Sequence, residues 1–185
     1  MVSFTVPTDG LISFSRMEKL IESEIGCVDI CDLNIPFATV VTDLDQGEQR
    51  ILRSGPLAKA VRASCSVPGF VTPVKMNDGH HYCDGGVADN LPVDAVREMG
   101  ADYIIGVDLF VPTYNRWLGP IGAGAAAFQT LVRLSGGGYK EADCLIIPDL
   151  SGTSFFRFSR SEEYIRIGEK AAEEAIPMIK AALGL

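Results

Sequence analysis

The sequence is short of positive charge, of histidine and of long apolar stretches. It carries 16 Lys and Arg residues against 24 Asp and Glu, which gives a net charge of −8 at pH 7, and it has only two histidines. A nucleic-acid-binding surface requires a basic patch, so this class of function is excluded. The longest uncharged stretch, 117–132, contains Pro120 and is too short to span a bilayer. We therefore expect no nucleic-acid partner and no transmembrane segment.

The cysteines do not form the pattern of a disulfide framework. They are odd in number and scattered along the chain, at Cys27, Cys31, Cys65, Cys83 and Cys144. A chain of 185 residues with 47% hydrophobic content can bury a core without crosslinks, which predicts free thiols in a reducing compartment. The first seven residues also lack the basic and apolar regions of a signal peptide. Both features predict a cytoplasmic protein.

Apolar periodicity predicts helices alternating with strands along the whole chain. Helices are expected over 15–25, 56–67, 93–99, 121–134 and 159–183, and strands over 37–44, 49–52, 71–76, 79–83, 103–109 and 144–148. Ser15 and Ser159 each precede a glutamate by three residues, the spacing of a capping box, and Pro177 is expected to kink or split the last helix. The run 103–109 is apolar enough for a strand covered on both faces. The order predicts an α/β architecture with a largely parallel central sheet, in a single domain over 1–185.

One stretch has the composition of a functional turn. Asp84 is followed by Gly85 and Gly86, two residues without a Cβ, and lies between a predicted strand and a helix that begins near Pro92. Glycine permits unusual backbone conformations and close approach of another chain or a ligand. An acidic side chain at such a turn suits a site, although Asp-Gly is also a common surface turn.

Several segments, in order and with fitting spacing, resemble the bacterial patatin-like acyl hydrolases. They cover most of the chain and are Ile35-Pro36-Phe37-Ala38 with Thr42-Asp43-Leu44, residues 60–70 (AVRASCSVPGF), Tyr82-Cys83-Asp84-Gly85-Gly86-Val87 with Asn90-Leu91-Pro92, Gly100-Ala101-Asp102, and Pro148-Asp149-Leu150. The resemblance implies a three-layer α/β/α fold and a phospholipase-type serine hydrolase of lipid degradation. It gives Asp84 the role of base in a serine–aspartate dyad, which requires neither histidine nor a cofactor.

The family's nucleophile motif, Gly-x-Ser-x-Gly, is absent from the 185 residues. We therefore expect a partial domain that lacks the N-terminal strands of the fold and carries only the aspartate half of the dyad. The serine would come from a missing N-terminal segment or a second chain, and the chain alone is expected to have little or no activity on a lipid or acyl-ester substrate. The alternative is a non-catalytic remnant kept as an interaction module. Either way, exposed core-facing surface predicts self-association.

Other candidate sites have weaker support. Ser64 and Ser66 flank Cys65 at a helix end with no evident base, and Ser54 is expected to cap a helix. A metal site is not expected either. Its potential ligands alternate between strand faces or lie in a loop, at Cys27, Cys31, Asp78, His80, His81, Cys83 and Asp84. Turn and cap roles are expected for Asp43, Asp108 and Asp149. The cluster 155–158 (FFRF) is expected to belong to the core.

Overall fold

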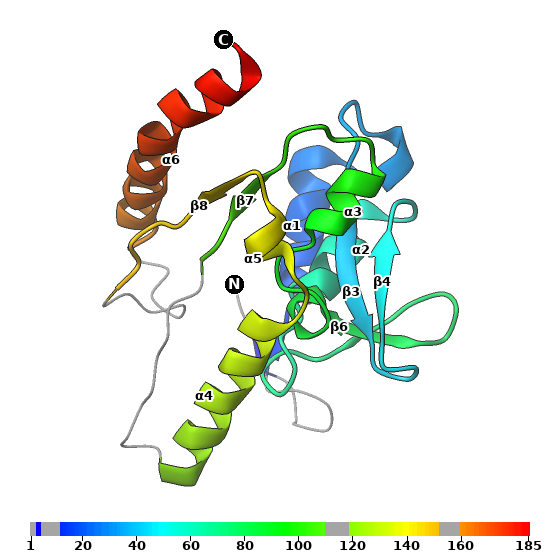
Figure 1. The fold of residues 1–185 in the computed structure, drawn as a ribbon. Helices are drawn as coiled ribbons and strands as arrows, with labels where there is room; N and C mark the ends of the chain where they lie inside the picture. Colours follow the sequence, from blue (N-terminus) through cyan, green and yellow to red (C-terminus); the bar gives the residue numbers. More distant parts are fainter. Residues whose placement is uncertain (1–2, 5–11, 110–118, 152–159) are drawn as a thin grey trace.

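The computed structural model describes residues 3–4, 12–109, 119–151 and 160–185. Figure 1 shows the order of the elements along the chain. The helices are α1 (Ser15–Ile25), α2 (Leu57–Ser64), α3 (Val93–Glu98), α4 (Gly119–Leu134), α5 (Gly138–Glu141) and α6 (Ser161–Leu183), with 3-10 turns η1 (Ile30–Asp32) and η2 (Gly85–Val87). The strands are β1 (Ser3–Phe4), β2 (Ile12–Ser13), β3 (Thr39–Asp43), β4 (Glu48–Leu52), β5 (Val74–Lys75), β6 (His81–Asp84), β7 (Ile105–Val107) and β8 (Cys144–Ile146).

The largest sheet is antiparallel, with the strand order β4-β3-β6-β5. Among the described strands, the one parallel pair is that of β7 with β8, which form a separate two-stranded sheet. An α/β protein is confirmed, but a largely parallel sheet is not. The reason is that residues 44–47 and 76–80 are short connections, and such connections can only join antiparallel neighbours.

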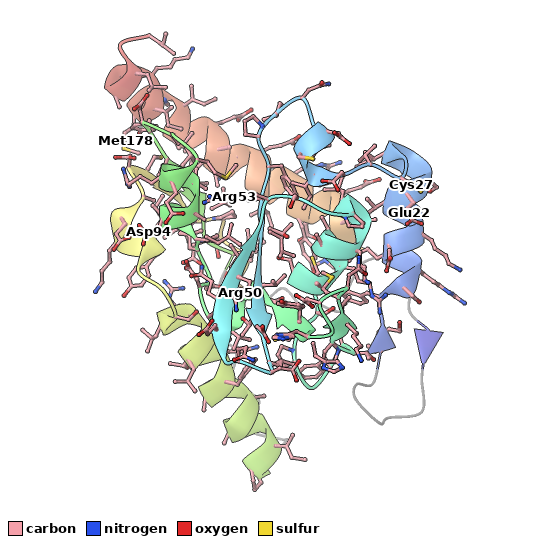
Figure 2. The ribbon with its side chains drawn as sticks, turned by 90° about the vertical axis from the view of Figure 1, so that its right-hand side faces the viewer. Glu22, Cys27, Arg50, Arg53, Asp94 and Met178 are labelled. Carbon is pink, nitrogen blue, oxygen red and sulfur yellow. The ribbon has the colours of Figure 1, made fainter. Side chains whose placement is uncertain are left out.

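The hydrophobic core next to this sheet is built around its two central strands, β3 and β6. All five residues of β3 are buried, as expected for a strand rich in β-branched residues. Val41 and Tyr82 pack with Ala63 of α2 and Val74 of β5. On the outer strand, Arg50 carries an exposed guanidinium 3.3 Å from Glu48, on the β3–β4 hairpin seen in Figure 2. This packing fixes the end of β6, and therefore Asp84, against β3.

The prediction that 103–109 is covered on both faces is wrong. Ile105 is 46% exposed and Val107 49% exposed, and β7 has only β8 beside it among the described strands. The helix α6 packs against β8 rather than over β7 (Figure 1). One apolar side of this two-stranded sheet therefore remains accessible.

The expected capping box at Ser15 does not form. The helix α1 is preceded by Phe14, which makes no side-chain cap hydrogen bond, and Ser15 is already its first residue. Glu18 instead accepts a hydrogen bond from Arg62 of α2 at 2.8 Å. A partner distant in sequence thus replaces the local one, and it ties α1 to α2.

Two further helix signals concern Ser54 before α2 and Pro177 in α6. Ser54 does not cap α2. The cap residue is Pro56, and the neighbouring Gly55 N–H donates to Asp29 Oδ1 at 2.8 Å. Pro177 lies inside α6 without splitting it. Ser159 and the cluster 155–158 lie outside the described residues. No helix in the described part of the chain is long and apolar enough to cross a membrane.

Candidate active site

Asp84 is the last residue of β6 and the cap of the 3-10 turn η2. Its backbone is fixed on two sides, because its N–H donates to Ser66 O at 2.9 Å and its carbonyl accepts from Thr42 Oγ1 at 2.9 Å. Its side-chain Oδ1 accepts the Gly86 N–H at 2.8 Å. The carboxylate is therefore held by the strand before it and by the turn after it.

The two glycines that follow are required for space rather than for backbone angle, since neither has a positive φ. A Cβ on Gly85 would lie 2.3 Å from the carbonyl oxygen of Val40, a contact that backbone atoms cannot relieve. A Cβ on Gly86 would lie 3.0 Å from Asp84 Oδ1 and 3.2 Å from Asn90 Oδ1. Gly85 thus lets the turn lie against β3, and Gly86 leaves room beside the carboxylate.

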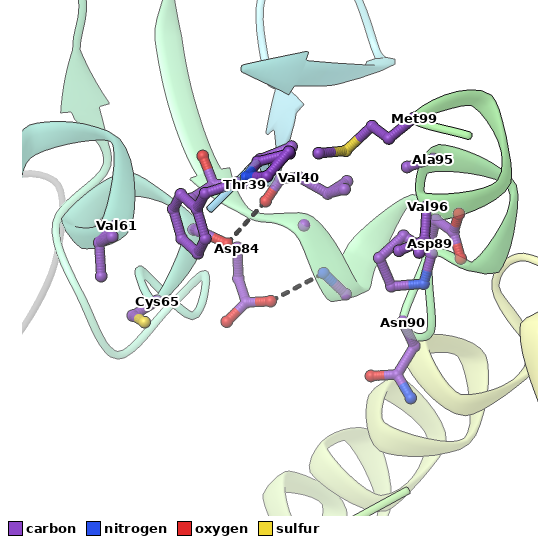
Figure 3. A pocket seen from close by; sticks show the side chains of 17 residues that line it. Thr39, Val40, Val61, Cys65, Asp84, Asp89, Asn90, Ala95, Val96 and Met99 are labelled. Atoms are coloured by element: carbon purple, nitrogen blue, oxygen red, sulfur yellow. Dashed lines mark hydrogen bonds between the residues drawn. The ribbon is translucent and has the colours of Figure 1, made fainter. Parts of the chain in front are cut away.

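Asp84 faces a cavity of about 510 Å³, shown in Figure 3. Most of the wall is apolar and comes from the segment before β3 and from helices α2 and α3, with Pro36, Phe37, Val61, Pro92, Ala95, Val96 and Met99 among its residues. A few polar groups complete it, which is the usual composition of a small-molecule site. The predicted base, Asp84, and both glycines of the predicted turn line this one cavity.

The surroundings make Asp84 a stronger base than an exposed carboxylate. Burial raises the pKa of the Asp84 carboxyl, and the Gly86 hydrogen bond offsets only part of this effect. In Figure 3 one carboxylate oxygen points to the Gly86 amide. No hydrogen bond within the described residues engages the other oxygen, so it is available to take a proton.

The serines considered as substitutes are engaged elsewhere. Ser64 lines the cavity but donates its hydroxyl to Val40 O at 2.7 Å. Ser66 is fully buried and donates to Arg62 O at 2.8 Å. Cys65 also lines the cavity, where desolvation and then the charge of Asp84 raise the pKa of its thiol. A protonated thiol is a poor nucleophile, so none of the three is activated by Asp84.

The groups considered as metal ligands do not gather as a set. Among the described residues, the grouping with metal-ligand geometry is Asp43, Asp45 and His80, away from the cavity wall. His80 Nδ1 lies 2.7 Å from Asp43 Oδ2, so these two residues form a hydrogen-bonded pair. Asp45 is a second acidic residue next to this pair. Cys83 is buried, and desolvation and then the charge of Asp84 raise the pKa of its thiol to about 11.

The remaining acidic candidates have structural contacts and do not line the cavity. Asp43 is fully buried and accepts the backbone N–H groups of Asp45 and Gln46, which forms the β3–β4 turn. Asp108 is buried and lies 3.2 Å from Arg133. Asp149 is exposed and accepts the N–H of the residue two positions on. The expected turn role is confirmed for Asp43 and Asp149.

The sequence reasoning missed Asp89, which also lines the cavity. Its Oδ2 accepts from Gln49 at 3.0 Å, while its Oδ1 is buried without a hydrogen-bond partner among the described residues. Burial raises the pKa of the Asp89 carboxyl. Gly136 closes over it, since a Cβ there would lie 2.1 Å from Asp89 Oδ1. The only sequence signal was its position five residues after Asp84, on the same turn.

Comparison with known proteins connects this chain to a family of phospholipases. The profile of the family described as "Patatin-like phospholipase" matches residues 2–97. The chain is 36% identical over 110 residues to "Neuropathy target esterase sws" of Drosophila melanogaster, and 33% identical over 110 residues to "Patatin-like phospholipase domain-containing protein 6" of Homo sapiens. Each alignment covers 59% of this chain and 8% of the relative.

A bacterial relative is covered more fully. An uncharacterized NTE family protein of Mycobacterium bovis is 36% identical over 106 residues, which are 56% of this chain and 29% of that protein. The chain therefore spans less than a third of the length of each of these relatives. The segment that matches the family profile makes up more than half of the chain and contains the β3–β6 pair, α2 and Asp84, and the chain belongs to the patatin-like phospholipase family.

Proposed function

We propose that this chain carries the aspartate half of a serine–aspartate dyad that hydrolyses acyl esters of lipids, with Asp84 as the general base. The observation that carries the proposal is the state of one carboxylate. One oxygen of Asp84 accepts the Gly86 N–H at 2.8 Å, the other has no hydrogen-bond partner among the described residues, and Asp84 lines a largely apolar cavity of about 510 Å³. This arrangement leaves a basic oxygen beside a space of the right character for an acyl chain.

The chemistry needs a serine hydroxyl within hydrogen-bond reach of the free oxygen of Asp84. As the serine oxygen bonds to the ester carbonyl carbon, its proton passes to the carboxylate. Collapse of the tetrahedral intermediate breaks the bond to the alcohol, which leaves with the proton from Asp84. Water then hydrolyses the acyl-serine with the same carboxylate as base. Because its pKa is raised, the Asp84 carboxylate is a stronger base at each step in which it accepts the proton.

We place the nucleophile on a segment outside these 185 residues, either earlier in a longer chain or on a second chain. The support is that no Gly-x-Ser-x-Gly motif occurs in the sequence, and that Ser64 and Ser66 donate to backbone carbonyls. On this proposal residues 1–185 form part of one domain and have little or no esterase activity alone. The five free thiols favour a reducing, cytoplasmic setting.

The test is active-site labelling of the protein as the cell makes it, translated from its whole reading frame. A fluorophosphonate probe is expected to modify a serine outside residues 1–185, located by peptide mass, and Asp84→Asn is expected to abolish the labelling. The matched control is Asp94→Asn, which removes the same charge from the exposed surface of α3 (Figure 2). An adduct within 1–185, or labelling of Asp84→Asn at the unchanged rate, would refute the proposal.

A non-catalytic interaction module remains the second candidate. It is favoured by the exposed apolar residues of β7 and α6, which include Ile105, Val107, Ile165 and Ile176. The same labelling experiment separates the two candidates. If the native protein has no serine that reacts with the probe while it forms a stable complex with another chain, the interaction module is the correct interpretation.

A further inference from the structure

The turn that follows Asp84 is anchored by a helix that comes much later in the chain. Ser135, the residue directly after α4, places its Oγ 2.7 Å from the carbonyl oxygen of Gly86. Val132 of α4 approaches the same glycine, since a Cβ on Gly86 would lie 3.4 Å from Val132 Cγ1. The end of α4 thus packs directly against η2, although the two bonded residues are 49 positions apart in sequence.

The backbone bonds that close η2 leave the carbonyl of Gly86 to α4. The N–H groups of Ala88 and Asp89 both donate to the carbonyl oxygen of Gly85, at 3.0 and 2.8 Å. The Gly86 carbonyl, which comes next in the turn, accepts instead from Ser135. The position of Gly86 therefore depends on a side chain outside the turn.

The hydroxyl of Ser135 has two acceptors within reach and a single proton. It lies 2.7 Å from Gly86 O and 2.6 Å from Val132 O, and it can donate to one of them at a time. Val132 O also accepts the Ser135 N–H at 3.1 Å. The contact that needs the hydroxyl is thus the one to Gly86.

Gly86 is also the residue that orients the predicted base. Its N–H donates to Asp84 Oδ1 at 2.8 Å, so the direction of the carboxylate depends on where the Gly86 backbone lies. One side of the turn is fixed against β3, where Gly85 leaves no space for a Cβ beside Val40 O. Ser135 fixes the other side. A three-residue 3-10 turn with two glycines has little stiffness of its own, so both supports are needed.

The end of α4 is itself held firmly. Arg133 lies 3.2 Å from the buried Asp108, whose backbone N–H donates to Ile146 O of β8 at 3.0 Å. The glycine after Ser135 also lies against the site loop, because a Cβ on Gly136 would be 2.1 Å from Asp89 Oδ1. A continuous set of contacts therefore runs from the β7–β8 sheet through α4 to η2.

We propose that Ser135 is a positioning residue for the proposed hydrolysis: its hydroxyl holds the Gly86 carbonyl, and through Gly86 it holds Asp84 in the direction needed to take the serine proton. The inference rests on the proposed function, because it takes Asp84 as the base. It goes beyond that function by giving α4, which follows the segment 2–97 that matches the family profile, a part in the reaction. Ser135 is not among the residues that line the cavity, so it acts through the turn.

The test uses the protein expressed from its whole reading frame and compares Ser135→Ala with Thr130→Ala. Thr130 Oγ1 donates to Ala126 O at 2.9 Å, so the control removes a hydroxyl bond to backbone from an exposed position of the same helix. Ser135→Ala is expected to lower kcat for a short-chain acylglycerol about tenfold with KM unchanged, because the base is misdirected while the ester still binds. Thr130→Ala should leave both constants unchanged.

The pH profile separates positioning from a loss of folded protein. Burial raises the pKa of the Asp84 carboxyl, and the Gly86 N–H lowers it. A loosened Gly86 bond should therefore move the acid limb of kcat/KM to higher pH in Ser135→Ala, whereas partial unfolding would lower the rate without moving this limb. Ser135→Thr keeps the hydroxyl and should restore both rate and profile. Ser135→Cys, which has only a weak S–H donor, replaces Ser135→Ala if that variant does not fold.

A combination with Asp84→Asn tests whether Ser135 acts through Asp84. Ser135→Ala should not lower the residual rate of Asp84→Asn any further, because no base remains to be positioned. The inference would be overturned by the same loss in both backgrounds, by an unchanged rate or pH profile of Ser135→Ala, by an equal loss in Thr130→Ala, or by Ser135→Thr that behaves as Ser135→Ala.

The failure of this inference is distinguishable from that of the proposed function. If Asp84→Asn hydrolyses the ester at the unmodified rate, the proposed function fails and the role of Ser135 fails with it. If Asp84→Asn is inactive while Ser135→Ala is unchanged, Asp84 remains the base and only the role of Ser135 is rejected.

Discussion

At the residue scale, the space around Gly85 explains how Asp84 reaches the cavity. The turn that follows Asp84 lies so close to β3 that a methyl group on Gly85 would be 2.3 Å from Val40 O. Val40 is itself buried within a strand that is paired on both sides. Neither the turn nor the strand can therefore move without loss of sheet hydrogen bonds.

Gly85→Ala is expected to destabilise the protein by about 3 kcal/mol, the upper end of the usual cost of overpacking, because the clash is with backbone. The matched control is Gly124→Ala in α4, where a Cβ would meet no atom within 4 Å. That change should stabilise by about 0.5–1 kcal/mol through helix propensity. Urea unfolding followed by circular dichroism measures both, and equal effects of the two changes would contradict the account of Gly85.

Asp84→Asn is expected to stabilise the fold at neutral pH. Burial raises the pKa of Asp84 in the folded protein, so the ionised carboxylate costs stability once the pH exceeds the unfolded-state value. The wild-type protein therefore loses stability relative to Asp84→Asn as the pH rises from about 4 to about 7. Unfolding free energies of both proteins across this range test the sign. An increase in the unfolding free energy of the wild-type protein relative to that of Asp84→Asn as the pH rises would contradict this prediction.

At the element scale, local signals predicted most helices and strands, and long-range contacts decided what they could not. The turn between β3 and β4 and the start of α2 are encoded within a few residues, and each lies one residue from its expected position. The antiparallel pairing of β3 with β6 joins residues as many as 43 positions apart, such as Val41 and Asp84. Apolar alternation is the same for either strand direction, so the sequence could not specify it.

The site shows the same division. Asp84 could be identified because Asp-Gly-Gly is a compact motif with a chemical rationale. Asp89 could not, because its burial depends on Gly136, which lies 47 positions further along the chain. Similarly, Glu18 has the spacing of a cap residue, but Arg62 binds it instead. A contact with a distant residue gave each of these side chains a role that its neighbours in sequence do not indicate.

The turn at the other end of β6 is expected to weaken as the pH rises above neutral. The hydrogen bond to Asp43 raises the pKa of His80 in the folded protein. The pair therefore contributes its full stabilisation below the unfolded-state pKa of about 6.5, and this stabilisation is lost as the pH rises through the higher pKa of the folded protein. His80→Asn keeps a nitrogen donor but cannot titrate, and it should cost more stability at about pH 6 than at about pH 8.5. His81→Asn is the control, because its contact with Asp45 is exposed. An equal cost of His80→Asn at both pH values would contradict the role given to the ion pair.

At the scale of the whole molecule, the exposed apolar surface is large for a protein that functions as a free monomer. On the described residues it includes one side of β7, parts of α4 and the outer part of α6, with Ile121 77% and Leu131 67% exposed. In Figure 1, α4 and α6 extend away from the β3–β6 sheet. Surfaces of this kind are usually covered by another part of the protein or by a partner.

The 185-residue chain is therefore expected to self-associate. Size-exclusion chromatography with light scattering should give a mass above 19.9 kDa that increases with protein concentration. Ile121→Lys with Leu131→Lys, two changes on exposed positions of α4, should shift the distribution toward the monomer. A concentration-independent monomer that unfolds cooperatively would show that this surface needs no cover.

The central claim is that the carboxylate of Asp84 takes the proton of a serine supplied from outside these residues. The most direct measurement is the initial rate of hydrolysis of a short-chain acylglycerol by the protein expressed from its whole reading frame, with Asp84→Asn and Asp94→Asn compared. A general base contributes about 10²–10⁴-fold, so Asp84→Asn should lower kcat by about that factor, while Asp94→Asn should leave it unchanged. Equal rates for Asp84→Asn and the unmodified protein would contradict the account.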